Sequence, residues 1–171
     1  MKRTLTVHRF LSAIAGLVFA AMVATPVTAD FVTQRMMSME MARDLAQETV
    51  NACRAMGYQT SAVVVDRGGH PQAILRDTLA APFTIQIAHD KARAVILSGV
   101  ASSAFREGRD DIRMEMNHVD GVLVLDGALP VVVAGSMVGA VGVSGAPGGH
   151  LDEQCAQEAL DALADRIEFV M

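Results

Sequence analysis

Apolar residues recur with the period of an α-helix in three segments of the chain, residues 36–56, 83–100 and 151–168. In the first segment Met37, Met41 and Leu45 share one face, and Gly57 follows as a helix-ending glycine. The second segment carries small residues on its apolar face, which would let it pack closely against its neighbours. These three segments are therefore predicted to be helices.

Five shorter segments are apolar or β-branched and are bounded by turn residues, as is typical of strands: 61–65, 70–76, 121–125, 129–134 and 137–143. Asp126-Gly127 and Gly135-Ser136 are hairpin signals between the last three. The predicted order is α-β-β-α-β-β-β-α, an α+β fold in which helices flank a five-stranded antiparallel sheet. Residues 101–119 are polar and irregular and are expected to form a short helix or a flap.

Residues 137–156 join the last predicted strand to the last helix through a glycine-rich turn. Gly139 and Gly142 lie inside the strand, where glycine marks a bulge or a close approach by a backbone or a ligand. Free N–H groups at such a junction suit a ligand, and a tight connection without one is the alternative. The candidate ligand-binding residues of this junction are Ser144, Gly145 and His150.

Residues 1–29 have the pattern of a secretory signal peptide. A basic start precedes the apolar residues 10–23, a stretch too short for a comfortable membrane span, and Val27-Thr28-Ala29 fits a cleavage site. We expect a mature domain of residues 30–171, periplasmic or secreted, without a membrane span after processing. An uncleaved anchor is the alternative.

The charge of the chain argues against a polyanionic partner. Cleavage after Ala29 would take the net charge from −5 to −8, because three basic residues and no acidic ones are removed. A chain of this charge repels nucleic acid and anionic membrane surfaces. Cys53 and Cys155 are the two cysteines, and we expect two buried, reduced thiols, with a disulfide as the alternative.

Several segments in order resemble the GlcG/HbpS-like haem-binding family, which includes the C-terminal domain of PduO-type proteins. They are Val65-Asp66 with Gly68-Gly69-His70, Arg76-Asp77, Ala88 with Lys91-Ala92, and Gly139 to Gly145 with Asp152-Glu153 and Cys155-Ala156. The resemblance implies a profilin-like five-stranded sheet with helices and a homo-oligomer, a dimer or larger. It implies haem as the cofactor, with a corrinoid or an iron ion as alternatives.

One turn departs from the family pattern. The family carries Gly-Gly-x-Pro ahead of its fourth strand, where this chain has Asp126-Gly127-Ala128-Leu129-Pro130. The family offers no shared axial ligand to transfer, so the haem ligand must be sought among residue types that bind haem iron. Four histidines outside the leader compete, and a solvent-exposed or structural role is the alternative for each: His70, His89, His118 and His150.

His89 has the most suitable neighbours in the sequence and is our predicted axial ligand. Arg76 and Lys91 could pair with haem propionates, and Asp77 could orient either base. A structural salt-bridge network is the alternative for these three charged residues.

A second metal hypothesis rests on Met114, Met116 and His118. Thioethers and an imidazole at alternate positions of an extended segment would lie on one side and suit Cu(I). No nucleophile–base pattern is evident, so we assign no catalytic residues.

Three functions remain open. The leading hypothesis is an exported, oligomeric haem-binding protein with a storage or sensory accessory role. The second is an accessory subunit or sensor of a periplasmic catabolic system that binds a small organic acid through Arg76, Lys91 and Ser144. The third is a haem-degrading enzyme.

Overall fold

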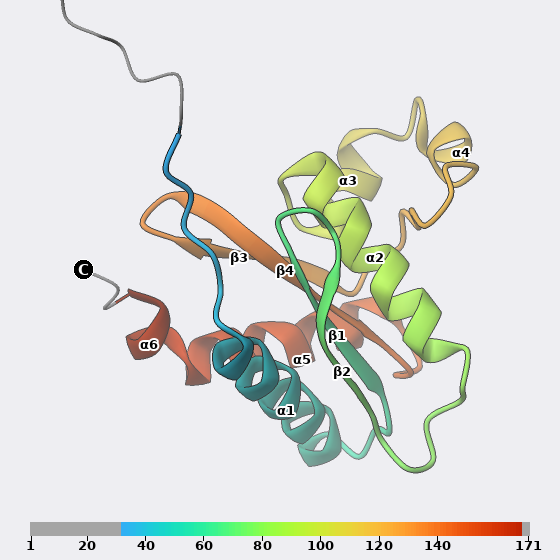
Figure 1. Cartoon of the computed structure of the whole chain (residues 1–171). Coiled ribbons are helices and arrows are strands. Elements are labelled where there is room, and N and C mark those ends of the chain that lie inside the picture. The colour runs from blue at the N-terminus through green and yellow to red at the C-terminus, as the bar shows by residue number, and fades with distance from the viewer. Residues whose placement is uncertain (1–31, 169–171) are drawn as a thin grey trace, which may run out of the picture. The chain divides into compact units, whose positions relative to one another are not determined.

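Four antiparallel strands form one sheet in the computed structural model, which describes residues 32–168 (Figure 1). The strands are β1 (Ser61–Asp66), β2 (Pro71–Arg76), β3 (Ala128–Val133) and β4 (Ser136–Ser144). Their spatial order is β2-β1-β4-β3, so the two hairpins meet along the central β1–β4 pair. The predicted signal peptide, residues 1–29, lies outside the described residues.

The predicted strand at residues 121–125 is wrong, and the sheet has four strands rather than five. Val122 and Val124 instead pack with Phe105, and the Leu123 amide donates to the Asp90 carbonyl at 3.1 Å. Their apolar side chains are thus buried against helices and not beside a neighbouring strand. The hairpin expected at Asp126-Gly127 is consequently absent.

The polar stretch at 101–119 holds two short helices, α3 (Ser102–Gly108) and α4 (Arg113–Met116). The observed order is therefore α-β-β-α-α-α-β-β-α-α. The α+β class with helices flanking an antiparallel sheet is confirmed.

The two faces of the sheet are covered by different helices. Helices α1 (Met39–Ala55) and α5 (Gly149–Ala162) lie on one face, and α2 (Thr84–Ser98) lies on the other (Figure 1). Alternation along β1 explains this, because Ala62 and Val64 enter the core beneath α1 and α5 while Val63 and Val65 face α2. A last short helix, α6 (Ala164–Glu168), follows α5.

The interior glycines of β4 permit close backbone contacts, as the sequence predicts. A Cβ at Gly142 would collide with the Ala88 carbonyl of α2, and one at Gly139 would collide with the Val65 carbonyl of β1. The contact at Gly142 lets α2 lie close to the sheet, and the contact at Gly139 is made between neighbouring strands. No helix among residues 32–168 is long and apolar enough to cross a membrane.

Candidate functional site

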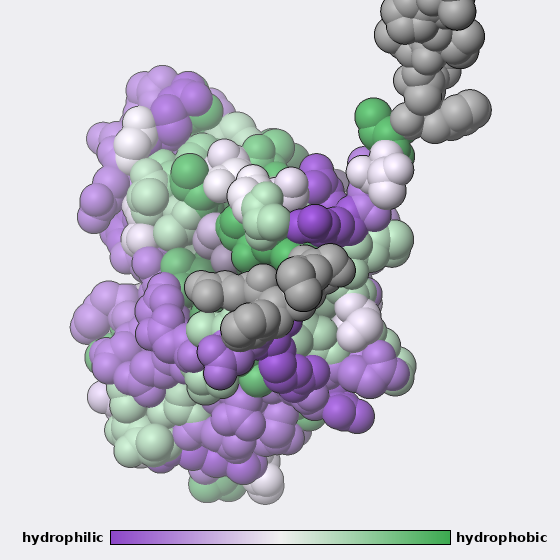
Figure 2. All heavy atoms as spheres, turned by 90° about the vertical axis from the view of Figure 1, so that its left-hand side faces the viewer, coloured by the Kyte–Doolittle hydropathy of each residue, from purple (hydrophilic) through white to green (hydrophobic). Residues whose placement is uncertain are grey.

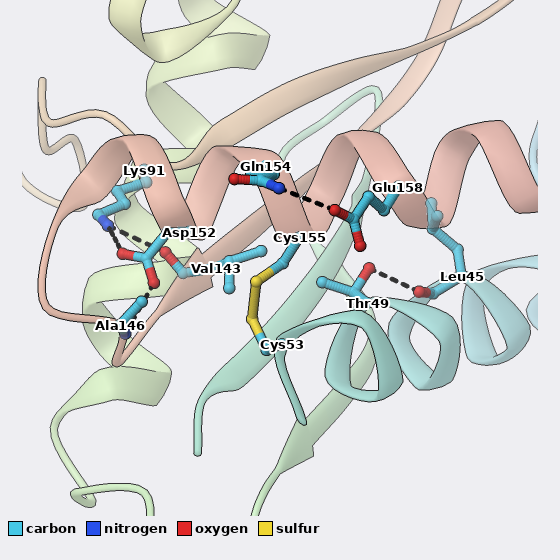
Figure 3. The surroundings of a disulfide bond; sticks show 10 residues. All are labelled: Leu45, Thr49, Cys53, Lys91, Val143, Ala146, Asp152, Gln154, Cys155 and Glu158. Atoms are coloured by element: carbon cyan, nitrogen blue, oxygen red, sulfur yellow. Dashed lines mark hydrogen bonds and ion pairs between the residues drawn. A yellow bond between two sulfur atoms is a disulfide. The ribbon is translucent and has the colours of Figure 1, made fainter. Parts of the chain in front are cut away.

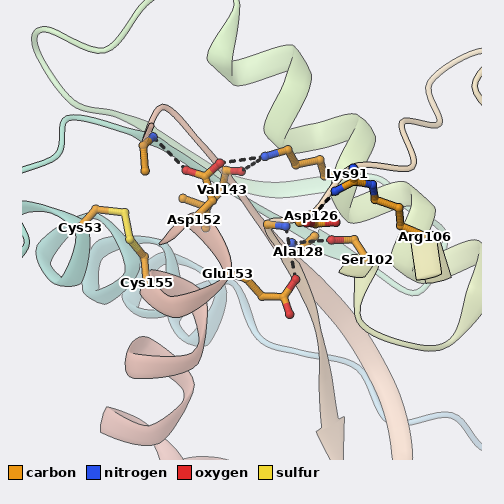
Figure 4. Close-up of polar contacts among 12 residues, drawn as sticks. Cys53, Lys91, Ser102, Arg106, Asp126, Ala128, Val143, Asp152, Glu153 and Cys155 are labelled. Atoms are coloured by element: carbon orange, nitrogen blue, oxygen red, sulfur yellow. Dashed lines mark hydrogen bonds and ion pairs between the residues drawn. A yellow bond between two sulfur atoms is a disulfide. The ribbon is translucent and has the colours of Figure 1, made fainter. Parts of the chain in front are cut away.

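A buried ion pair underlies the glycine-rich junction (Figure 3, Figure 4). Lys91 Nζ donates to Asp152 Oδ2 at 2.8 Å and to the Val143 carbonyl at 2.9 Å. The other oxygen of Asp152 accepts from the Ala146 amide at 3.0 Å. One pair thus joins α2, the end of β4 and the first turn of α5.

The burial of this pair restricts its chemistry. Only 2% of the Lys91 side chain and 4% of the Asp152 side chain are exposed. Burial raises the pKa of the Asp152 carboxyl, and the adjacent Lys91 ammonium opposes that rise. Lys91 is therefore paired inside the protein with almost no exposure, which matches the structural ion pair given above as the alternative to a contact with propionates.

The turn that departs from the family pattern keeps the glycine that this pair requires. Gly127 has a φ of 121°, and a Cβ there would lie 2.7 Å from Lys91 Nζ and 2.8 Å from the Asp152 Cβ. The next position is Ala128, whose amide donates to Ser102 Oγ at 2.9 Å. Ala128 does not have a positive φ, so alanine fits this position without left-handed backbone strain.

Ser144 and Gly145 do not form an open platform. Ser144 is buried and pairs with Ser61 in the sheet, while a Cβ at Gly145 would lie 2.7 Å from the Gln59 carbonyl. His150, the second residue of the following helix, is exposed. For the first two residues the structure matches the tight-connection alternative.

Asp77 has a different partner from those expected. Arg54 of α1 donates to both of its carboxylate oxygens, at 2.6 and 2.8 Å, and the Thr78 amide donates at 2.7 Å. These bonds, that of Arg54 first, lower the pKa of Asp77. Arg76 instead donates to the Ala80 carbonyl. The Asp77 carboxylate therefore orients neither Arg76 nor Lys91: it pairs with Arg54, and Lys91 pairs with Asp152.

His89 lies half-buried on α2, with Nε2 3.1 Å from the Gly69 carbonyl. A neutral ring that donates from Nε2 keeps its lone pair on Nδ1, which is how a metal-ligating histidine is commonly fixed. His70 lies 3.3 Å from Asp66 and is exposed, as is His118. Of these three histidines, His89 has the environment that best suits an iron ligand.

The geometry assumed for the copper hypothesis is wrong. Residues 113–116 are helical, so Met114 and Met116 point in different directions around α4 and do not alternate along an extended segment. Met114 is 68% exposed. Within the part of the chain that the structure describes, no group of three or more His, Cys, Asp and Glu side chains could hold a metal ion.

The sequence analysis missed an apolar groove of about 260 Å³ beside the start of α1. We name it the methionine groove; it is lined by Arg35, Met36, Met37, Ser38, Met41, Val131, Val133, Val138, Arg166 and Ile167. Figure 2 views the side of the molecule that carries α6 and β3, where apolar and strongly hydrophilic surfaces meet. The run of methionines at 36–41 was the available signal, but only the fold brings β3, β4 and α6 against it.

Two arginines of the lining, Arg35 and Arg166, give this groove its positive charge. Arg166 Nη1 lies 2.8 Å from Asp44 Oδ2, and Arg43 lies 2.6 Å from the other oxygen of the same carboxylate. The hydrogen bond from Arg166 is the main cause of a lowered pKa at Asp44. Arg35 forms no ion pair with a side chain of residues 32–167. The arrangement suits an apolar ligand that carries carboxylates.

Cys53 and Cys155 form a disulfide, so the expectation of reduced thiols is wrong (Figure 3). The two Cα atoms lie 5.2 Å apart, and both residues are fully buried between α1 and α5. Neither helix alone indicates this distance, because 102 positions separate the two cysteines in the sequence.

The family model described as haem degrading protein HbpS-like matches residues 37–161. The chain belongs to the HbpS-like family. Protein GlcG of Escherichia coli is 32% identical over 112 residues, which are 66% of this chain and 84% of GlcG. These matches confirm the resemblance inferred from the sequence.

Solved HbpS-like structures share the fold. A crystal structure of HbpS has a TM-score of 0.72 at 30% identity and covers 82% of this chain and 99% of its own. A double mutant of Streptomyces reticuli HbpS has a TM-score of 0.71 at 32% identity, covering 82% of this chain and 97% of that one. The structure of a PduOC:heme complex, at 21% identity, has a TM-score of 0.65 over 75% of this chain and 95% of that one, which shows likeness of fold alone.

Proposed function

We propose that this protein is an exported, oligomeric haem-binding protein with a storage or sensory accessory role, and that haem lies in the methionine groove. Membership of the HbpS-like family supports a haem-related role. The groove carries the proposal, because it combines an apolar lining with two guanidinium groups. Haem has the matching chemistry, an apolar ring that bears two propionates.

The lining suggests how each part of haem would be held. Arg35 and Arg166 would pair with the propionates. Met37 and Met41 would pack on the ring, and a methionine thioether is one of the axial ligands that haem iron accepts in proteins. His89 lies on α2, across the sheet from the groove, and would serve only haem bound on that opposite side or a groove supplied by another copy.

The size of the groove supports an assembly of more than one copy. At about 260 Å³ it is smaller than the roughly 300–1,000 Å³ of sites that enclose an organic ligand. One copy would therefore cover only part of a haem, and a second copy would complete the enclosure. A ligand that contacts two copies stabilises the assembled state by mass action.

The test is a hemin titration of the purified mature protein, followed by its Soret absorption. We expect a saturable spectral shift, and a flat titration with both ferric and ferrous haem would overturn the proposal. Arg166→Gln should weaken binding by about tenfold, the effect of one lost charge-assisted hydrogen bond. Arg109→Gln is the matched control, since Arg109 is equally exposed and also paired with an aspartate, but lies outside the groove.

The axial ligand is tested by the same titration. With haem in the groove, Met41→Leu or Met37→Leu should change the spectrum of the complex, while His89→Ala should leave it unchanged. A spectral change in His89→Ala alone would move the haem to the α2 side of the sheet. Light scattering with and without hemin tests the assembly, and a monomer under both conditions would contradict it.

Haem degradation is the second candidate function, and the name of the matching family model favours it. An enzyme of this kind would convert bound haem into a bilin when a reductant and oxygen are supplied. Simple reduction of the iron, with the Soret band retained, would exclude degradation and leave binding as the function.

A further inference from the structure

Methionines beside the groove differ sharply in their access to solvent. Met36 lines the methionine groove and is 78% exposed, whereas Met37 lines the same groove and is 7% exposed. Met39 is 62% exposed but does not line the groove. Within this short segment, Met36 is therefore both exposed and part of the groove, Met37 is part of the groove but buried, and Met39 is exposed but outside the groove.

An exposed thioether is open to oxidation by a hydroperoxide. The sulfur lone pair attacks one peroxide oxygen, the O–O bond breaks and an S–O bond forms. With hydrogen peroxide, the released hydroxide takes the proton of the OH group now on sulfur and leaves as water, so sulfur loses two electrons and the peroxide gains them. The product is methionine sulfoxide, which sulfoxide reductases return to the thioether.

We propose that Met36 is a peroxide-oxidation site whose conversion to the sulfoxide lowers the affinity of the methionine groove for its ligand. The change turns an apolar wall of the groove into a polar one with a strong hydrogen-bond acceptor. Arg35 and Arg166 line the same groove and offer charged donors to that oxygen. Oxidation thus removes apolar contact and occupies a guanidinium that would otherwise meet a carboxylate of the ligand.

This inference rests on the proposed function in taking the groove to be the ligand site, and it concerns the ligand-free protein, before haem and a second copy enclose the groove. The first test needs no ligand: the native mature protein is treated with dilute hydrogen peroxide and its peptides are mapped by mass. Met36 and Met39 should gain one oxygen before Met37 does. Equal rates at Met36 and Met37 would overturn the proposal.

The second test measures binding after the peroxide has been removed, with hemin as the probe. Oxidised wild-type protein should bind about tenfold more weakly than untreated protein, the scale expected for placing a polar group against an apolar ligand. Met36→Leu should keep its affinity after treatment, whereas Met39→Leu should lose affinity as the wild type does. Protection by Met39→Leu, or none by Met36→Leu, would contradict the proposal.

A second probe separates this inference from the haem proposal. Anilinonaphthalene sulfonate is apolar and anionic and reports binding by its fluorescence. If hemin does not bind but the dye does, and oxidation at Met36 weakens the dye, the inference stands and the haem proposal fails. If hemin binds and the oxidation of Met36 changes nothing, the haem proposal stands and this inference fails. If neither probe binds, both fail.

Discussion

The Lys91 ammonium group and the Asp152 carboxylate lie 2.8 Å apart with almost no exposure to solvent. Removing one partner of a buried pair leaves the other charge without compensation, which costs about 3–5 kcal/mol. Lys91→Met should therefore lower the free energy of unfolding by that amount in urea denaturation. The double variant Lys91→Met/Asp152→Asn should lose less, because no isolated charge remains and the amide oxygen can still accept from Ala146. Equal losses would show that the ion pair is not the source of the effect.

Gly127 should tolerate substitution less well than Gly135, another glycine with a positive φ. Gly127→Ala adds a Cβ against Lys91 Nζ at a φ of 121°. Gly135, with a φ of 76°, has nothing within 4 Å of the same position, so Gly135→Ala carries only the strain of the left-handed conformation, about 1–2 kcal/mol. Thermal unfolding of the two variants should show the larger loss for Gly127→Ala, and a smaller one would contradict the contact.

The disulfide between Cys53 and Cys155 should contribute strongly to stability. In the chain-entropy model a crosslink across about 100 residues stabilises the folded state by up to about 5 kcal/mol, and measured values are commonly 2–4 kcal/mol. The variant Cys53→Ala/Cys155→Ala should lower the free energy of unfolding by this amount.

Alkylation of the wild-type protein under denaturing, non-reducing conditions is an independent test of the disulfide. It should label no thiol, and labelling of both cysteines would contradict the bond. The same treatment after reduction is the control that both residues are reactive once freed.

Asp77 should contribute to the loss of folding stability at acidic pH. Its pKa is lowered in the folded protein from an ordinary value of 3.8, mainly by the hydrogen bonds from Arg54. The stabilisation is present above the unfolded-state pKa and is lost as the pH falls through the lower folded-state value. Stability of the wild type should therefore fall below about pH 4. Asp77→Asn should have a lower free energy of unfolding at neutral pH. Its free energy of unfolding, measured by urea denaturation at several pH values, should change less between neutral and acidic pH than that of the wild type.

The leader is tested by the intact mass of the exported protein. Cleavage after Ala29 should give a chain that begins at Asp30, because Val27 and Ala29 occupy the small-residue positions of the cleavage site. A mass that retains residues 1–29 would contradict the prediction.

Local patterning was enough to locate most of the secondary structure. The helical periods at 36–56 and 83–100 correspond to α1 and α2. Gly57 follows α1 as expected, whereas Gly99, placed inside the second predicted helix, ends α2. Residues 151–168 form α5 and α6, which are separated at Leu163. The prediction of a strand at 121–125 was wrong because an apolar run indicates that its side chains are buried, but does not indicate whether a strand or a helix covers them.

The sequence by itself determined the α+β class, the family and the need for small residues at Gly139 and Gly142 of β4. These features follow from the type and spacing of residues close together in the chain. Only the tertiary structure decided which distant groups meet. It paired Lys91 with Asp152, Arg54 with Asp77 and Cys53 with Cys155. It also assembled the methionine groove from α1, β3, β4 and α6. The partner of a charged residue or a cysteine cannot be predicted from local sequence, because contacts between distant segments depend on how the helices pack on the two faces of the sheet.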